Sequence, residues 1–297
     1  DTELHTILTG FVPDDHEAIK NAVSPKPVAD RPIGVGCRGR RLSPAYGRLG
    51  RLKAEVGGVM LAEAQRRHVV HDISIEEKDR IYGDEGLRFI ASCRCMLGSE
   101  SGSNIFDWDG SIHRRCREET DPSSLRAIAS EIEASENDAG MGQISPRIFE
   151  CAMLRTPMAL IAGRYSGLIE ADTHYIPIAE DFTNLDDVFR RIADTEAIQA
   201  MADRAHADLV ATEAHTSQRN IERIVQAIQA RSERYTSIRP VFDHPDAVDF
   251  FPPSPGSALI EEPTPLPRLL KRPWRERRFL STLFAMARLV VPQRHHA

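Results

Sequence analysis

Apolar residues in the first half of the chain follow two alternating spacings, which predict strands separated by helices. Short apolar runs typical of buried strands occur at 33–36, 69–73 and 95–98. Between the first two, residues 45–67 repeat apolar positions every three or four residues, as the inward face of a helix does. A shorter helix is predicted over 84–92. Strands that alternate with helices favour an α/β fold with a parallel sheet and crossover helices.

The second half of the chain continues this alternation. Its clearest helix start is Ser145-Pro146, because serine can cap a helix and proline fits the first helical turn. We therefore expect a Rossmann-like parallel sheet with helices on both faces. The further strands are predicted at 158–161 and 175–178, and the further helices at 124–133, 147–154, 184–192, 197–212 and 215–231.

Changes in composition divide the chain into four parts. Residues 1–30 hold one short strand candidate followed by prolines, and are expected to be a connector or the remnant of an N-terminal domain. Residues 31–232 form the Rossmann-like unit, and 233–267, rich in proline, serine and acids, form a linker. Residues 268–297 mix Arg and Lys with large apolar residues, as a basic amphipathic tail does. This tail either lies on a membrane surface or docks onto the protein itself.

Composition narrows the classes of partner and the compartment. A net charge of −6 and a pI near 6.0 give no reason to expect nucleic acid as a partner. The five cysteines lack zinc-finger spacing, so we expect buried free thiols in a reducing compartment. No signal peptide is visible, and no apolar run approaches the roughly 20 residues that cross a bilayer. The expected location is the cytoplasm, at a membrane periphery if the tail binds lipid.

The segment around the helix start at Ser145 has the chemistry of an anion site. The first turn of a helix presents unpaired backbone N–H groups and a positive dipole end, which suit a diphosphate. Arg147 in that turn can add a charge-assisted contact, and Glu150, one turn on, can accept hydrogen bonds from ribose hydroxyls. The small residues of 163–167 let a ligand approach the backbone. This site lies where open α/β sheets bind ligands, at the carboxyl ends of parallel strands.

The run ISPRIFECAMLRTPMALIAGRYSGLIE, residues 144–170, resembles the donor-binding segment of retaining GT-B glycosyltransferases, in a branch similar to spore-maturation proteins. Runs similar to other segments of that branch occur in the same order, so the resemblance covers about residues 6–230. It implies that Glu150 holds the donor ribose and that Tyr165, Ser166 and Gly167 lie near the diphosphate. The runs outside 144–170 are RPIGVGCRGR, HDIS, DRIYG, SCRCMLGSESGSNIFDWDG, HYIP and DFTNL.

Basic residues after the first strand supply the expected catalytic cations. In this family an Arg and a Lys from this region commonly offset the negative charge that develops on the leaving diphosphate. Arg38 or Arg40 is the candidate here, with Lys53 as a further one. The alternative is a solvated loop of arginines. Asp72, which follows in the second strand, is expected to form a helix-capping pair with Ser74.

Acidic residues after the third strand offer a further contact. Glu100 can bind the sugar or the base, or it can belong to a capping or turn network. Asp107 and Asp109 flank Trp108 in the spacing of a metal-binding pair, but the resemblance implies no metal held by paired aspartates, so we expect none. Many relatives carry two glutamates separated by seven residues, and the first of them would fall at Gly142 here. The role of that first acid is therefore in doubt.

These features predict a hexosyltransferase-type glycosyltransferase, or its donor-binding domain. It would move a sugar from a nucleotide diphosphate-sugar to an unknown acceptor, with no cofactor beyond the donor. An N-terminal domain or a partner chain would supply the acceptor half. The alternative is a non-catalytic module that binds a nucleotide-sugar or a membrane surface.

Overall fold

The computed structural model describes residues 7–134 and 141–232. The chain divides into two compact units, one of them Thr6–Asn220 and the other composed of Asp1–His5 and Ile221–Ala297. All five strands belong to the first unit. The predicted linker and basic tail, 233–267 and 268–297, lie outside the described residues.

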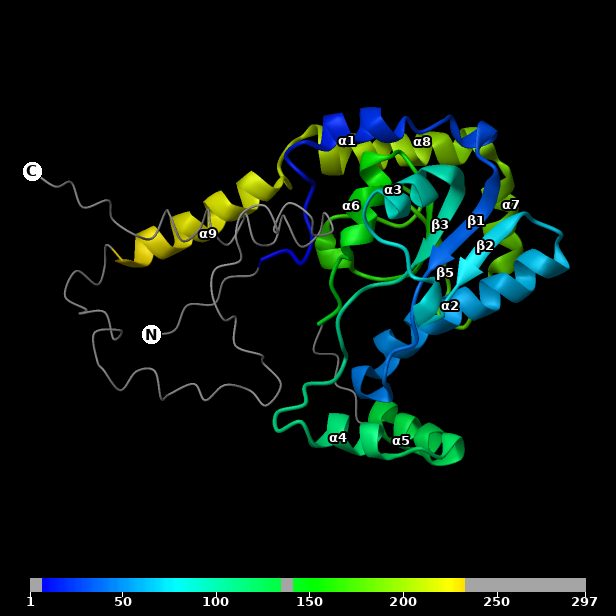
Figure 1. Cartoon of the computed structure of the whole chain (residues 1–297), viewed down its shortest axis with the longest axis vertical. Coiled ribbons are helices and arrows are strands. Elements are labelled where there is room, and N and C mark those ends of the chain that lie inside the picture. The colour runs from blue at the N-terminus through cyan, green and yellow to red at the C-terminus, as the bar shows by residue number, and fades with distance from the viewer. Residues whose placement is uncertain (1–6, 135–140, 233–297) are drawn as a thin grey trace, which may run out of the picture. The chain divides into compact units, whose positions relative to one another are not determined.

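A five-stranded parallel sheet forms the centre of the first unit, in the spatial order β2-β1-β3-β4-β5 (Figure 1). The chain passes from β1 to β2 on one side and then back to β3 on the other side of β1. The order therefore reverses between β1 and β3, and open α/β sheets bind ligands at such a switch point, outside the carboxyl ends of the strands. The strands are β1 (Ile33–Arg38), β2 (His71–Ser74), β3 (Cys93–Gly98), β4 (Met158–Ile161) and β5 (Ile176–Ile178).

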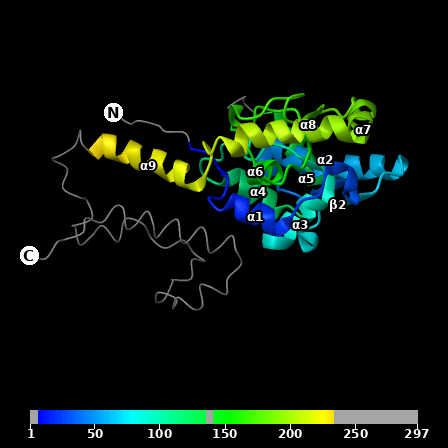
Figure 2. The same ribbon diagram turned by 90° about the horizontal axis from the view of Figure 1, so that it is seen from above.

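Helices cover both faces of this sheet, which confirms the predicted fold class. One apolar core lies between the sheet and α3 and α6, and a second lies between the opposite face and α2 and α7 (Figures 1 and 2). The helices are α1 (His16–Val23), α2 (Gly47–Arg66), α3 (Gly83–Ser92), α4 (Ser111–Glu118), α5 (Pro122–Ala134), α6 (Pro146–Met153), α7 (Leu185–Ala193), α8 (Thr195–His206) and α9 (Ser217–Ser232).

Helix α2 lies close against the sheet because a glycine faces it. A Cβ added at Gly57 would lie 2.5 Å from Cγ2 of Ile75, so only glycine permits this approach. Lys53 lies four residues earlier and therefore on the same side of the helix. The close packing brings that lysine over the carboxyl end of β1.

Three elements differ from the predicted ones. Helix α1 lies within the stretch expected as a connector, because the eleven residues between Pro13 and Pro25 contain no proline and place Ile19 and Val23 against the core. Helix α4 was not predicted from its mainly polar sequence. The strand expected near the N-terminus is, in its described part, a single bridge between Val12 and Thr216.

Candidate functional site at the carboxyl edge of the sheet

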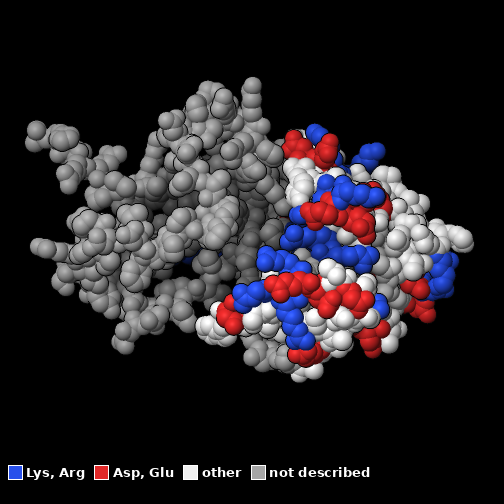
Figure 3. Space-filling view, turned by 60° about the horizontal axis from the view of Figure 1, so that its bottom comes forward, with Lys and Arg blue, Asp and Glu red and all other residues white. Residues whose placement is uncertain are grey.

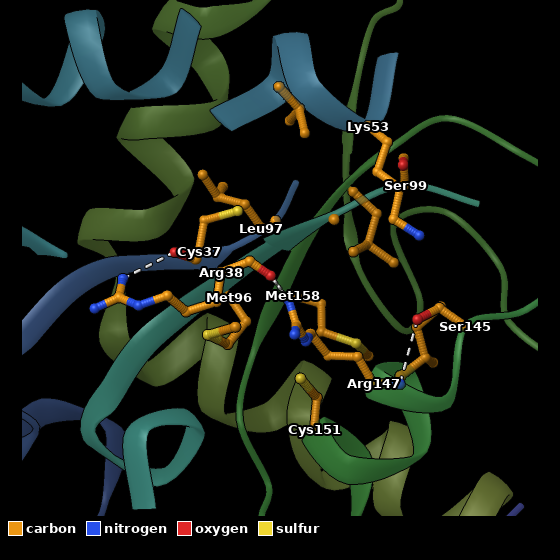
Figure 4. Close-up of a pocket in the computed structure, with 15 residues that line it drawn as sticks. Cys37, Arg38, Lys53, Met96, Leu97, Ser99, Ser145, Arg147, Cys151 and Met158 are labelled. Atoms are coloured by element: carbon orange, nitrogen blue, oxygen red, sulfur yellow. Dashed lines mark hydrogen bonds between the residues drawn. The ribbon is translucent and has the colours of Figure 1, made fainter. Parts of the chain in front are cut away.

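A small cavity of about 50 Å³ opens at the switch point, between the carboxyl ends of β1 and β3. Helix α2 closes it on one side and the amino end of α6 closes it on the other (Figure 4). Its charged lining residues are Arg38, Lys53 and Arg147, and none of its lining residues is acidic. The cavity therefore has a positive character.

The amino end of α6 has the predicted capping geometry. Ser145 is extended (φ −82°, ψ 143°), and its Oγ accepts a hydrogen bond from the Arg147 N–H at 3.3 Å, while Pro146 occupies the first turn. The helix therefore begins where the sequence predicts. Its positive dipole end is directed at the cavity.

Lys53 enters the cavity from α2, largely shielded from solvent. Its Nζ lies 3.3 Å from the Ser101 Oγ. Burial lowers the pKa of this amine, and the nearby guanidiniums of Arg147 and Arg40 lower it further. Because these cations repel one another, an anion that binds between them relieves the repulsion and is stabilised.

Arg147 crosses from α6 to the end of β1. Its Nη1 donates a hydrogen bond to the carbonyl oxygen of Arg38, which fixes the guanidinium at the cavity wall (Figure 4). Helix α6 thus contributes both its dipole and a positioned cation.

The side chain of Arg38 is directed away from this cavity (Figure 4). Its Nη2 lies 2.6 Å from Oδ1 of Asp72, and its guanidinium lies 4.4 Å from the ring centre of Phe89. The expectation that Asp72 caps a helix with Ser74 is wrong, because the parallel pairing of β1 with β2 places the Asp72 carboxylate beside Arg38. Arg40, the other predicted catalytic arginine, is exposed in the loop after β1.

A second cavity, of about 190 Å³, adjoins the first, and Ser99 lines both. Glu100 lies in it, with Oε1 accepting the Tyr165 N–H at 2.8 Å. A Cβ added at either Gly142 or Gly163 would lie 2.8 Å from Oε2 of Glu100. The carboxylate is therefore held between two glycines, and it occupies the space that a side chain at position 142 would enter.

The predicted diphosphate loop is a tight left-handed turn after β4. Tyr165, Ser166 and Gly167 have φ values of 45°, 56° and 73°, a conformation that costs energy in residues with a Cβ. The Tyr165 side chain is fully buried, with its hydroxyl donating to the Ile161 carbonyl oxygen at 2.5 Å. The Ser166 Oγ accepts the Ile144 N–H at 3.1 Å. The Tyr165 side chain thus anchors the turn in the core. Ser166 and Gly167 are exposed to solvent.

Glu150 lies in the second turn of α6, where it is half-buried. It is not among the residues that line either of these two cavities. Its contact with ribose stays a prediction.

Asp107 and Asp109 act as backbone acceptors at the start of α4. The Asp107 carboxylate accepts the N–H groups of Ile112 and His113, and Asp109 accepts that of Ser111. Within residues 7–134 and 141–232, no group of three or more His, Cys, Asp or Glu side chains is placed to hold a metal ion.

The cysteines and the lengths of the helices also bear on the predictions, for the described part of the chain. All five cysteines are buried free thiols, as predicted. None of the described helices combines the length and the apolar composition that a bilayer crossing requires.

Basic side chains gather on the side of the molecule where the strands end. The strands run toward the lower part of Figure 1, and Figure 3 brings that side forward. Lys and Arg form a band near the middle of the described surface in this view, bordered by acidic side chains.

Comparison with known proteins gives structural similarities at low sequence identity. No protein-family model and no curated protein matches the chain. Solved structures that it resembles include Anabaena Alr3699/HepE in complex with UDP-glucose (TM-score 0.39, 14% identity) and the same protein with UDP and glucose (0.39, 15%). A glycosyltransferase from Rickettsia africae has a TM-score of 0.33 at 12% identity.

The similarity covers 76% of this chain and 57% of the Anabaena chains, and 75% and 56% for the Rickettsia protein. The chain thus spans little more than half the length of these proteins.

Proposed function

We propose that this chain is the donor-binding domain of a glycosyltransferase and that its switch-point cavity holds the diphosphate of a nucleotide-sugar. One observation carries the proposal. Lys53, Arg147 and the amino end of α6 converge on a cavity whose lining contains no carboxylate. A cluster of cations without acidic partners in its wall favours a multiply charged anion.

The proposed chemistry follows from where charge develops. When a glycosyl group leaves a nucleotide-sugar, negative charge builds on the departing diphosphate, and fixed cations stabilise that transition state. Lys53 and Arg147 supply these cations in the proposal, with Arg40 as a further contributor from its exposed loop. Arg38 supports the site indirectly, because its carbonyl oxygen positions Arg147.

The second cavity is the proposed place of the sugar. It is lined by the Glu100 carboxylate, the Asn104 amide and the Arg164 guanidinium, among other residues. Such groups form hydrogen bonds with sugar hydroxyls. Glu150, on α6, is kept as the proposed ribose contact, and Ser166 and Gly167 as backbone contacts. An acceptor half from an N-terminal domain or a partner chain stays a prediction, as does the membrane role of residues 268–297.

Nucleotide binding tests the proposal directly. Thermal unfolding of the full chain is measured with UDP, GDP and ADP at millimolar concentration, because a ligand that binds only the folded state raises the midpoint. At least one of the three should raise it. Lys53→Met and Arg147→Met should each remove most of this shift.

Matched controls are Lys78→Met and Arg88→Met, which change exposed residues outside both cavities. They should keep the shift. If no nucleotide shifts the midpoint of the unsubstituted chain, or if the cavity variants keep the full shift, the diphosphate site is wrong. Glu150→Ala then tests the ribose contact, with a weaker response expected for the nucleoside diphosphate than for the unsubstituted chain.

A further inference from the structure

An exposed aromatic pair lies on the loop between β3 and α4. The ring centres of Phe106 and Trp108 are 4.3 Å apart, with the planes inclined at 60°. Phe106 is 56% exposed and Trp108 is 87% exposed. Side chains of this size are strongly favoured in contact with other groups, so two of them side by side in solvent indicate a binding surface.

The loop is held by its own hydrogen bonds. The Asp107 carboxylate, between the two rings in sequence, accepts the His113 N–H at 2.9 Å, and Asp109 accepts the Ser111 N–H at 2.9 Å. The Ser103 Oγ accepts the Ile105 N–H at 2.9 Å. These hydrogen bonds fix the backbone both before Phe106 and after Trp108.

The pair lies close to the second cavity. Asn104 lines that cavity and is fixed there, since its Oδ1 accepts the Leu49 N–H at 2.6 Å. An extended chain spans at most about 3.6 Å per residue, so the Cα atoms of Phe106 and Trp108 lie within about 7 Å and about 14 Å of that of Asn104. The rings therefore lie within the reach of one to three sugar rings from the cavity.

We propose that Phe106 and Trp108 form a stacking platform for a carbohydrate acceptor of the transfer reaction, an inference that rests on the proposed function. The face of a pyranose ring carries C–H groups that pack on an aromatic ring, and its hydroxyls hydrogen-bond to carboxylates at the rim. Asp107 and Asp109 lie at that rim. Each keeps acceptor capacity, because a carboxylate has about four acceptor positions.

Size and charge distinguish a carbohydrate from other occupants. A stable protein interface buries about 800 Å² on each partner and has few charged residues at its centre. Here Asp107 and Asp109 flank Trp108 in the sequence, and Arg114 lies close enough to Asp109 to interact with it electrostatically. A membrane surface is disfavoured because the two aspartates would face anionic lipid, and the hydroxyl of Ser111 lowers the pKa of Asp109, which keeps that carboxylate charged.

The sequence allows a specific optical test. The chain has two tryptophans, so Trp274→Phe in the full chain leaves Trp108 as the sole indole. Its fluorescence is titrated with maltohexaose, cellohexaose, mannohexaose and chitohexaose. The free protein should show the red-shifted, iodide-quenchable emission of an exposed indole. At least one saccharide should shift the emission to the blue in a saturable manner.

Variants in the same background separate the platform from the fold and from the nucleotide site. Phe106→Ala should weaken the saccharide response by about tenfold, corresponding to the loss of one stacking ring. Val70→Ala, an exposed residue at the opposite edge of the sheet, should leave it unchanged. Lys53→Met should abolish the thermal shift with nucleotide and leave the saccharide titration unaffected, so failure of the nucleotide site and failure of the platform are distinguishable.

Three results would overturn the proposal. The first is no response to any of the four saccharides. The second is a blue, iodide-protected emission in the free chain, which would show that Trp108 is already covered. The third is a Trp108 signal that responds to lipid vesicles or to protein concentration and to no saccharide, which would assign the pair to a membrane or to a second copy.

Discussion

Lys53 illustrates, at the scale of one residue, how a binding site costs stability. Its amine is largely shielded from solvent beside the guanidiniums of Arg147 and Arg40, and it donates a hydrogen bond to the neutral hydroxyl of Ser101. A buried charge without an opposite charge destabilises the folded state. Its retention is explained if a bound anion supplies that opposite charge.

Replacing this lysine should therefore stabilise the unliganded protein while removing its ligand response. Lys53→Met keeps the length of the side chain and packs against the apolar wall near Val56. We expect a higher thermal midpoint without nucleotide and no further rise with it. Lys78→Met, at an exposed position, should change neither midpoint. A lower midpoint for Lys53→Met without ligand would contradict the assignment.

The same lysine predicts a pH dependence with a definite sign. Because the pKa of Lys53 in the folded protein is below its ordinary value of 10.5, the unfolded chain binds more protons between the two values. The free energy of unfolding therefore rises as the pH increases between these two pKa values. The cost of burying the charged amine is fully present below the pKa of the folded state and is absent above the pKa of the unfolded chain.

Urea unfolding at several pH values between 7 and 10.5 measures this effect. The stability advantage of Lys53→Met over the unsubstituted chain should be largest at pH 7 and should shrink toward pH 10.5. Lys78→Met should show no such trend. An advantage that grows with pH would show that the folded protein favours the charged amine.

At the scale of an element, helix α6 has a binding role at one end and a structural role at the other. Its amino end is directed at the cavity, and its carboxyl end is capped by a buried arginine. Arg31, 2% exposed, donates to the carbonyl oxygens of Leu154 and Arg155, both at 3.1 Å, and to the Thr156 Oγ at 2.7 Å. It also donates to the Cys93 carbonyl oxygen, so one side chain joins the end of α6 to the start of β3.

Loss of that guanidinium should destabilise the whole domain. Arg31→Met leaves several buried carbonyl oxygens without donors, and each unsatisfied group costs about 1–3 kcal/mol. We expect a loss of at least about 3 kcal/mol in the free energy of unfolding in urea. Arg88→Met, at an exposed position of α3, should change it by no more than about 0.5 kcal/mol. Equal effects of the two would remove the capping role of Arg31.

The loop that holds Glu100 gives a second prediction at this scale. A Cβ at position 142 would lie 2.8 Å from the Glu100 carboxylate, so Gly142→Ala should displace that side chain. If Glu100 binds the sugar, the variant should lose affinity for a nucleotide-sugar and keep it for the free nucleotide, as calorimetry with UDP-glucose and UDP would show. An equal loss for both ligands would place the defect in the nucleotide site.

A matched glycine substitution controls for the added methyl group. Gly58, in the interior of α2, has no neighbour within 4 Å of an added Cβ. Gly58→Ala should stabilise the protein by about 0.5–1 kcal/mol and leave both affinities unchanged.

Sequence patterns predicted the elements well where the signal is local. The strand at 158–161 and the helix start at Ser145 are confirmed at the predicted residues, because an apolar run and a Ser-Pro cap need no distant partner. The direction of the Arg38 side chain could not be predicted in this way. It depends on the pairing of β1 with β2, which places Asp72 within reach.

The role of Lys53 was likewise indistinct in the sequence. A single lysine on an amphipathic helix is usually solvated, and only the close packing of α2 at Gly57 brings this one into the cavity. The two missed helices, α1 and α4, are only eight residues long, and they are stabilised by contacts with distant segments. Residues that act through tertiary packing are thus the ones that sequence patterns leave out.

At the scale of the molecule, net charge and local charge have opposite signs. The chain carries a net charge of −6, yet the switch-point cavity is lined by basic residues and no acidic ones. A nucleoside diphosphate is thus repelled by the chain as a whole and attracted by the cavity. Salt screens both interactions, over a Debye length of about 10 Å at 0.1 M ionic strength.

The sign of the salt dependence therefore tests where the ligand binds. An anion in contact with Lys53 and Arg147 should bind more weakly as NaCl is raised from low to high concentration, because the close attraction is larger than the distant repulsion. Calorimetric titration with UDP at constant pH measures this. An affinity that rises with salt would mean that the anion binds away from the cation cluster and experiences mainly the net negative charge. In the double variant Lys53→Met, Arg147→Met, any remaining binding should depend less steeply on salt, since two of the attractive charges are then absent.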